Sequence, residues 1–222
     1  MHRLKEIDNL GVDYFLRAGN TNIGMFNVLG KGGVGIVMKV KAKDNKIYAL
    51  KIRRVDANRS SMEREVVLQR MANLVGVGPR VYASSENFIL MDCIDGWNIG
   101  CWLSQQNISI NQVHNIVTST LEQCYRLDMA NFDHGELSFL NNHLLISEEL
   151  KAHIIDFESA STSRPAHNVT SATHALLLSG RVSKLIGDNI NIKNDEELLG
   201  LLRVYKRNKN RENFEKILKV LT

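Results

Sequence analysis

The sequence has little that would direct a chain into or across a membrane. None of its apolar runs approaches the roughly 18 residues that a transmembrane helix needs. Its first eight residues, Met-His-Arg-Leu-Lys-Glu-Ile-Asp, lack the apolar core of a secretory signal peptide. We therefore expect a cytoplasmic protein without a membrane partner.

Cysteine is also scarce, and it occurs in an odd number. Cys93, Cys101 and Cys124 are the three cysteines, and no two of them form a CxxC pair. Such pairs, or an even set of cysteines, are typical of zinc sites and of domains held by disulfides. The sequence therefore predicts reduced thiols rather than a disulfide framework or a zinc site.

What is present is the composition of an ordinary globular protein, with 44% hydrophobic and 23% charged residues and a formal charge of +4. A chain of 222 residues can form one larger domain or two small lobes that share a cleft. Basic residues gather near the C-terminus, at Arg203, Lys206, Arg207, Lys209, Arg211, Lys216 and Lys219. They could contact nucleic acid or an acidic partner. The lack of a recognisable nucleic-acid-binding motif favours a solvated helix face instead.

The spacing of apolar residues divides the chain into three parts. Residues 1–24 are predicted to be a helical extension. Residues 25–94 alternate as strands of an antiparallel sheet, with one helix at about 60–74. Residues 95–222 are predicted to be mostly helical, with helices at 102–106, 110–127, 171–186 and 195–221 and a strand pair at 144–146 and 153–155. We predict an α+β protein with a boundary near Asp95.

A glycine-rich turn follows the first strand of the second part. The segment Leu29–Val37 contains Gly30, Gly32, Gly33 and Gly35. Glycine lets a backbone pass close to phosphates, because no Cβ intervenes. Similar spacing in dinucleotide-binding folds opens a helix, whereas here the alternation continues as a strand. A Walker A loop is excluded because Lys31 is followed by glycine. The segment is predicted to be a phosphate-covering flap or, alternatively, a structural turn.

Lys51 on strand 47–52 and a carboxylate on the following helix are candidates for an ion pair. Lys51 has apolar neighbours and shares a face with Ala49, so its ammonium can face a cleft and meet phosphate oxygens. Glu63 and Glu65 are both available to hold this lysine, and we favour Glu65 because an apolar run follows it. A surface lysine and an exposed glutamate are the alternatives.

Two later segments carry candidate catalytic and metal-binding groups. Glu136 is followed five residues later by Asn141, which gives a base and an amide oxygen for a metal. Asn142 could take the place of Asn141. Asp156 ends a buried apolar strand and can bind Mg²⁺ between phosphates, although an acid at a strand end is often only a cap.

Taken in order, these five patterns resemble the protein-kinase superfamily over residues 29–158. Within it the chain is similar to small atypical kinases of the RIO and KEOPS-associated type, which carry His-Gly-Asp where His134-Gly135-Glu136 stands here. No Ala-Pro-Glu signature or long activation segment follows Asp156. The resemblance implies a bilobal fold, with an antiparallel N-lobe sheet and one helix, a hinge at 91–94 and a reduced helical C-lobe.

The resemblance also implies ATP and Mg²⁺ as ligands, with a role for each matched residue. The four glycines would cover the phosphates, and Lys51 would bind the α- and β-phosphates while it pairs with Glu65. Glu136 would be the catalytic base, Asn141 a ligand of a second metal and Asp156 the main Mg²⁺ ligand. Adenine would contact Val37, Ala49 and the backbone of Asp92 and Ile94.

The implied activity is that of a serine/threonine-protein kinase acting on itself or on one structured protein partner. Glu136 in place of aspartate, and Glu158 in place of the glycine after Asp-Phe, favour the alternative of an ATP-binding pseudokinase or ATPase switch. A small-molecule phosphotransferase and a nucleic-acid module are further alternatives. Candidate self-modification sites are Ser159, Ser161, Thr162 and Ser163. All these roles require Lys51 and Asp156 to act on the same triphosphate.

Overall fold

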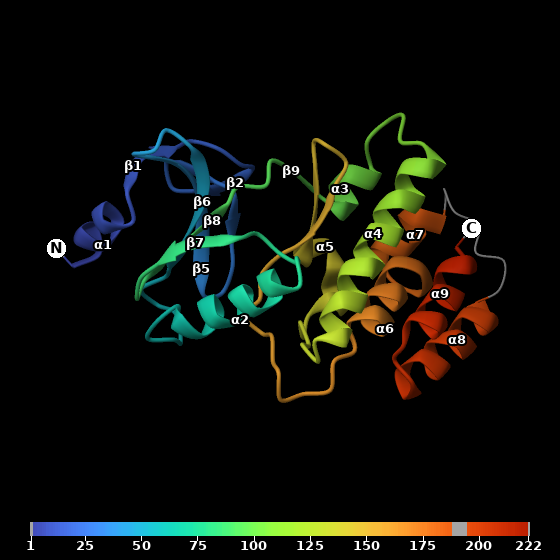
Figure 1. Cartoon of the computed structure of the whole chain (residues 1–222). Coiled ribbons are helices and arrows are strands. Elements are labelled where there is room, and N and C mark those ends of the chain that lie inside the picture. The colour runs from blue at the N-terminus through green and yellow to red at the C-terminus, as the bar shows by residue number, and fades with distance from the viewer. Residues whose placement is uncertain (1, 188–194, 222) are drawn as a thin grey trace. The chain divides into compact units, whose positions relative to one another are not determined.

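The computed structural model describes residues 2–187 and 195–221 and has the predicted α+β composition, with antiparallel sheets (Figure 1). The chain forms two compact units. The first contains Met1–Asn73 and Pro79–Ile94, and the second contains Leu74–Gly78 and Asp95–Thr222. Residues 1, 188–194 and 222 of the predicted lobes lie outside the described residues. No described helix has the length and apolar character needed to cross a bilayer.

The first unit is built on a six-stranded antiparallel sheet. Its strand order is β1-β5-β6-β8-β7, with β4 paired to β5. The strands are β1 (Val12–Leu16), β4 (Gly30–Lys31), β5 (Gly35–Ala42), β6 (Ile47–Arg53), β7 (Val81–Ser84) and β8 (Phe88–Asp92). A separate ribbon pairs β2 (Thr21–Ile23) with β3 (Phe26–Val28).

The alternation along β6 sends side chains to two faces of this sheet. One face packs Leu50 into a core with Val40 and Phe88. On the other face Ile89 of β8 packs against Val66 of helix α2 (Glu63–Leu74), which lies along the sheet in Figure 1. The face under α2 is the one that carries Lys51, because Ile89 is the Cα partner of Lys51 across the β6–β8 ladder.

The prediction that residues 1–24 form a helical extension is wrong after Asn9. Helix α1 spans His2–Asn9, and Gly11 follows it with a φ of 71°. Residues Val12–Leu16 then form β1, which pairs with β5. Valine, tyrosine and phenylalanine favour strands when a sheet edge is available. That edge is supplied by β5, which apolar spacing within residues 1–24 cannot reveal.

The second unit is mainly helical. Its helices are α3 (Ile99–Leu103), α4 (Ile110–Met129), α5 (Leu140–His143), α6 (Asn168–Thr173), α7 (Arg181–Gly187), α8 (Asp195–Arg207) and α9 (Arg211–Lys219). A 3₁₀ turn, η1 (Leu137–Phe139), and a π turn, η2 (His174–Leu178), complete the helical part. A small sheet has the order β11-β10-β9, with β9 at Gly96–Asn98, β10 at Leu144–Ser147 and β11 at Ala152–Ile154.

Three predicted helices in this unit have the wrong bounds. The segment 171–186 is broken by η2 and by Gly180, which has a φ of 100°. The segment 195–221 is broken before Asn210, whose side chain caps α9 by accepting the Asn213 N–H at 2.8 Å. The helix predicted at 102–106 starts at Ile99, because Asn98 accepts the Cys101 N–H at 2.8 Å. Side-chain caps set the starts of α3 and α9, and the spacing of apolar residues does not reveal such caps.

Candidate functional site

In the first unit Lys51 and Glu65 form a buried ion pair. Lys51 Nζ lies 2.5 Å from Glu65 Oε1, and the two side chains are 8% and 2% exposed. Glu65 lies in the first turn of α2, where the helix dipole favours a carboxylate. Glu63, the other candidate, is exposed. The structure therefore brings Lys51 together with Glu65.

Val37 and Ala49 lie on the same face of the sheet as this lysine. Val37 is the Cα partner of Lys51 across the β5–β6 ladder, and Ala49 precedes Lys51 by two residues. Ala49 is buried and Val37 is half-buried. An added Cβ at Gly35 would come within 3.1 Å of Lys51 Cε. Gly35 is therefore explained by the close packing of the lysine stem.

The other three glycines of the turn have no such explanation within the described chain. An added Cβ at Gly30 or Gly33 would meet nothing within 4 Å, and at Gly32 only the Gly35 carbonyl at 3.8 Å. None of the three has a positive φ. The Gly32 N–H donates to the Gly35 carbonyl at 2.8 Å, which closes the turn tightly. Neither packing nor backbone conformation in the described residues thus requires glycine at these positions.

The predicted hinge lies at the end of β8. The Asp92 carboxylate accepts the Arg80 N–H at 2.9 Å and the Tyr82 hydroxyl at 2.8 Å. The Asp92 N–H donates to the Arg80 carbonyl at 3.0 Å, so this group is engaged within the sheet. Ile94 is half-buried and is the last residue of the first unit.

In the second unit β11 leads into Asp156, whose backbone is left-handed with a φ of 69°. This conformation costs a non-glycine residue about 1–3 kcal/mol, so the surrounding contacts must hold it. The preceding residue is fixed on both sides. The Ile155 carbonyl lies 3.0 Å from His134 Nε2, and the Ile155 N–H donates to the His143 carbonyl at 3.0 Å. Helix α4 also supports β11, because Gln123 donates to the Ala152 carbonyl at 2.8 Å.

His134 has no exposed surface. Burial lowers the pKa of His134 to about 4, so its ring is neutral near pH 7. Its contact with the Ile155 carbonyl requires the Nε2–H tautomer, because a carbonyl oxygen can only accept. His134 thus acts as a fixed hydrogen-bond donor behind Asp156.

An anchor that the sequence analysis missed holds the segment around His134. The Asn168 side chain accepts the His134 N–H at 2.9 Å and donates to the Phe132 carbonyl at 2.6 Å. Asn168 is itself held by Asp128, a buried residue of α4, through its backbone and amide N–H groups at 2.8 and 2.9 Å. Tyr205 of α8 also donates to Asp128. Burial raises the pKa of Asp128, with these hydrogen bonds acting in the opposite direction.

Glu136 and His143 face each other a few residues apart. Glu136 Oε2 lies 3.5 Å from His143 Nε2, and the two side chains are 34% and 10% exposed. The His143 ring contacts the His134 ring at a centroid distance of 5.4 Å. The candidate base therefore has a buried imidazole beside it, which the sequence pattern did not assign to any role.

Asn141 has a partner within the protein. Its side-chain oxygen accepts the Gly100 N–H at 3.1 Å, at the start of α3. An amide oxygen has a second lone pair that could still bind a metal, so this role stays a prediction. Asn142 is exposed. Among the described residues, no group of three or more His, Cys, Asp or Glu side chains is arranged to hold a metal ion.

Loop 159–164 is fixed against the segment that contains Glu136. Arg164 pairs with Asp133 at 2.9 Å and donates to the Ser159 carbonyl at 2.7 Å. Gly135 has a φ of 89°, and an added Cβ would lie 2.6 Å from the Arg164 guanidinium. In this loop Thr162 and Ser163 are exposed, whereas Ser159 and Ser161 are half-buried.

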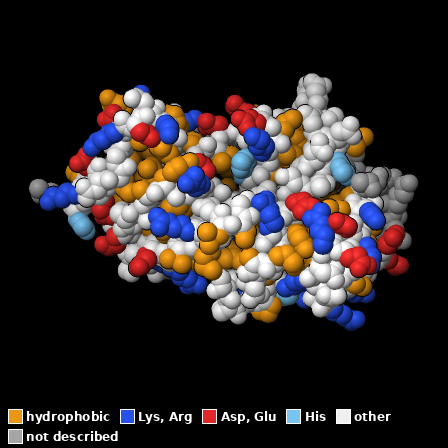
Figure 2. Space-filling view, in the orientation of Figure 1, with side chains coloured by type: hydrophobic (Ala, Val, Ile, Leu, Met, Phe, Trp, Pro, Cys, Tyr) orange, Lys and Arg blue, Asp and Glu red, His pale blue; other side chains and the backbone are white. Residues whose placement is uncertain are grey.

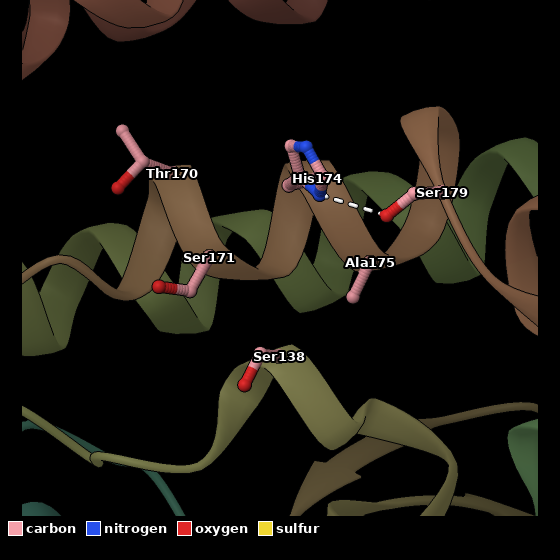
Figure 3. Close-up of a pocket in the computed structure, with 6 residues that line it drawn as sticks. All are labelled: Ser138, Thr170, Ser171, His174, Ala175 and Ser179. Carbon is pink, nitrogen blue, oxygen red and sulfur yellow. Dashed lines mark hydrogen bonds between the residues drawn. The ribbon is translucent and has the colours of Figure 1, made fainter.

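A cavity of about 350 Å³ lies beside η1 (Figure 3). Its lining consists of Ser138, Thr170, Ser171, His174, Ala175 and Ser179. In Figure 3 Ser171 and Ala175 extend toward the side on which Ser138 lies. No lysine, arginine, aspartate or glutamate lines it, so it lacks the charge to hold a triphosphate. Ser138 follows Glu136 by two residues, which places their Cα atoms within about 7 Å.

The basic residues near the C-terminus are partly neutralised. Arg211 pairs with Glu122 at 2.8 Å and Glu215 at 2.9 Å, and these carboxylates raise the pKa of Arg211. Lys216 pairs with Glu212 at 2.7 Å. Figure 2 shows acidic and basic side chains interspersed over α8 and α9. These helices therefore present a mixed surface on this face rather than a continuous basic one.

The sequence also has a relative. No family model matches the chain. It is 30% identical over 106 residues to the uncharacterized protein MJ1211 of Methanocaldococcus jannaschii. The match covers 48% of this chain and 88% of the relative. At this identity and coverage, the chain belongs to the same family as the Methanocaldococcus protein.

Proposed function

We propose that this chain is an ATP- and Mg²⁺-dependent phosphotransferase with a bilobal protein-kinase-like fold, and that it acts as a small serine/threonine-protein kinase similar to the RIO and KEOPS-associated type. The observation that carries this proposal is the buried Lys51–Glu65 pair. Burying two charges costs several kcal/mol each before their attraction is counted, and apolar residues often stabilise a fold equally well. A buried cation is therefore more informative about ligand binding than about stability.

The glycine turn supports a phosphate ligand next to this cation. Within the described residues, neither packing nor backbone conformation requires glycine at positions 30, 32 and 33, and the space around these glycines is open. Open space around a glycine backbone suits close approach by phosphate oxygens, which the backbone N–H groups can bind. Lys51 would bind the α- and β-phosphates, while Val37 and Ala49 on the same sheet face would contact adenine.

The second unit would supply the metal ligands. Mg²⁺ is commonly held by one or two protein oxygens together with substrate phosphates, so Asp156 and Asn141 suffice by ligand count. When bound, the ion would neutralise charge on the phosphates. Asp156 fits this role because Ile155, the residue before its strained backbone, is fixed by contacts with His134 and His143.

Glu136 would act as the base toward the acceptor. In the transfer, the acceptor hydroxyl oxygen bonds to the γ-phosphorus while the bond between that phosphorus and the bridging oxygen of ADP breaks. The hydroxyl proton passes to the Glu136 carboxylate. The cavity beside Ser138 would receive the acceptor segment, since its neutral hydroxyls can pair with the C=O and N–H groups of a polypeptide.

One observation favours the alternative of an ATP-binding pseudokinase. The Asn141 oxygen already accepts the Gly100 N–H, which weakens it as a ligand for a second metal. Such a protein would bind nucleotide without transferring phosphate and would act by switching a protein partner.

Phosphate transfer from γ-labelled ATP with Mg²⁺ tests the proposal directly. The wild-type chain should label itself or an added protein, and Asp156→Ala should abolish the label. Asp195→Ala, which removes an exposed carboxylate in the first turn of α8, is the matched control and should label normally. Nucleotide binding without transfer or hydrolysis would favour the pseudokinase. Failure to bind ATP at all would exclude both.

A further inference from the structure

We infer that His143 is the positioning residue for Glu136: its imidazole holds the Glu136 carboxylate in place for the acceptor. This inference rests on the proposed function, because it assigns His143 a role in the same phosphate transfer. His143 does not itself contact nucleotide or acceptor in this scheme. It acts through Glu136.

The geometry gives His143 this position. Its Nε2 atom lies 3.5 Å from Glu136 Oε2, and its side chain is only 10% exposed. The Glu136 side chain is 34% exposed, so its carboxylate has one side toward solvent and one toward the ring. A long glutamate side chain has considerable rotamer freedom. An imidazole at this distance limits that freedom and leaves the solvent side of the carboxylate open.

The position of His143 is itself fixed from the other side. Its ring packs edge-on against His134, at a centroid distance of 5.4 Å and an interplanar angle of 66°. His134 in turn lies 3.0 Å from the carbonyl of Ile155, the residue before Asp156. The two histidines thus join Glu136 to the strand end that carries Asp156. The candidate base and the residue before the candidate metal ligand therefore contact the same buried pair of histidines.

Packing alone does not account for a histidine at position 143. Its Nδ1 atom is buried and has no hydrogen-bond partner among the described residues. A buried polar atom without a partner is unfavourable, and an apolar side chain of similar size would avoid this cost. The Nε2 atom faces Glu136, so its interaction with the carboxylate is the contact that an apolar residue would lose.

Steady-state kinetics of three full-length variants would test this role. His143→Leu removes the ring nitrogen, and kcat should fall about tenfold to a hundredfold, the range expected for a misplaced catalytic group. KM for ATP should stay within about twofold, because the nucleotide contacts are unchanged. His143→Gln keeps an N–H near the Nε2 position and should recover most of kcat. His114→Leu, on α4, removes another histidine with a buried unpartnered nitrogen and should have wild-type kcat.

The Glu136→Gln variant separates a role of His143 in positioning the carboxylate from a purely structural role. In a Glu136→Gln chain, adding His143→Leu should lower kcat no further, because the carboxylate that His143 positions is already absent. An equal loss in both backgrounds would mean that His143 only supports the fold, and would overturn the inference. Full kcat in His143→Leu would also overturn it. His143→Gln decides if His143→Leu does not fold or if Glu136→Gln has no measurable turnover. Most of the wild-type kcat in His143→Gln would support the inference, and a loss of kcat would overturn it.

The proposed function and this inference fail differently. A wild-type chain that transfers no phosphate removes both. A wild-type chain that transfers phosphate, and whose kcat does not depend on position 143, removes only the role of His143.

Discussion

Between about pH 4 and pH 6.5, the His134 ring is neutral in the native state but protonated in the unfolded chain. Burial lowers the pKa of His134 from 6.5 to about 4. Because the unfolded state binds more protons between these values, stability is complete above pH 6.5 and is lost as the pH falls toward 4. From pH 7.5 to pH 5 this residue alone should cost about 2 kcal/mol, at 1.36 kcal/mol per pH unit.

Urea unfolding at the two pH values measures this loss. His134→Gln removes the titrating ring while keeping a donor that can reach the Ile155 carbonyl. The difference in unfolding free energy between pH 7.5 and pH 5 should be about 2 kcal/mol smaller in this variant. An equal pH dependence in both proteins would mean that His134 titrates normally in the folded state.

Gly78 shows how a single backbone position constrains the Asp156-Phe157 segment. It has a φ of 80°, and an added Cβ would lie 2.4 Å from Phe157 Cε2. Phe157 is fully buried and also packs against His134 at a centroid distance of 5.1 Å, so its ring has little room to move. Gly78→Ala should therefore destabilise the protein by about 2–4 kcal/mol, combining left-handed strain with overpacking.

The matched control is Gly180→Ala. Gly180 has a φ of 100° but nothing within 4 Å of an added Cβ, so it should lose only the backbone preference, about 1–2 kcal/mol. Urea midpoints of the two variants separate the two contributions. If Gly78→Ala costs no more than Gly180→Ala, the Phe157 ring is free to shift.

The sequence predicted well those secondary-structure elements that depend on the local spacing of apolar residues. The alternation around Leu50 placed β6, and the glycine turn was followed by a strand, as observed for β5. The errors arise where a distant contact decides. Residues 12–16 pair with β5 instead of extending α1, and Asn210 ends one helix and caps the next.

The candidate site divides in the same way. Lys51 and Glu65 could be paired from the sequence, because a strand followed by a helix over the same sheet face fixes their approach within one short segment. The hydrogen-bond partners of the candidate residues in the second unit could not be predicted in this way. Asn168 holds His134 from 34 residues away, and the Asn141 oxygen accepts from Gly100, 41 residues away. Such contacts depend on how α3 and α6 pack, which residue types and spacing do not encode.

Helix α6 and the turn η1 carry a prediction of their own, because they line the neutral cavity. Ser171→Phe should fill part of this space with a bulky ring. If the acceptor segment lies there, transfer to a protein acceptor such as dephosphorylated casein should fall about tenfold or more, as expected for a misplaced reacting group. KM for ATP should stay unchanged, since the cavity has no charged lining.

Ser119→Phe is the control for Ser171→Phe. It places the same ring at an exposed position of α4, outside the cavity. Transfer measured for the two variants with wild-type protein alongside would separate cavity filling from a general effect of an added aromatic residue. Unchanged transfer in Ser171→Phe would place the acceptor elsewhere.

For the whole molecule, the proposed function requires residues of both units to act on one nucleotide. A ligand that binds only the native state raises its stability, by about 2.7 kcal/mol at a hundredfold excess over Kd. For a chain of this size that corresponds to a rise in Tm of about 5–10 °C. Mg·ATP should therefore raise the Tm of the wild-type protein by this amount.

Lys51→Met and Asp156→Ala should each remove most of this rise, one by losing a phosphate contact in the first unit and the other a metal ligand in the second. Lys51→Met removes the ammonium that pairs with the buried Glu65 carboxylate, which by itself can cost about 3–5 kcal/mol. Each shift must therefore be measured against the nucleotide-free Tm of the same variant. Lys46→Met, at an exposed position before β6, controls for the loss of one lysine and should keep the full shift. A full shift in Asp156→Ala together with none in Lys51→Met would mean that the first unit binds the nucleotide without the second. The reverse result would remove the buried Lys51–Glu65 pair from nucleotide binding, and with it the observation on which the kinase proposal depends.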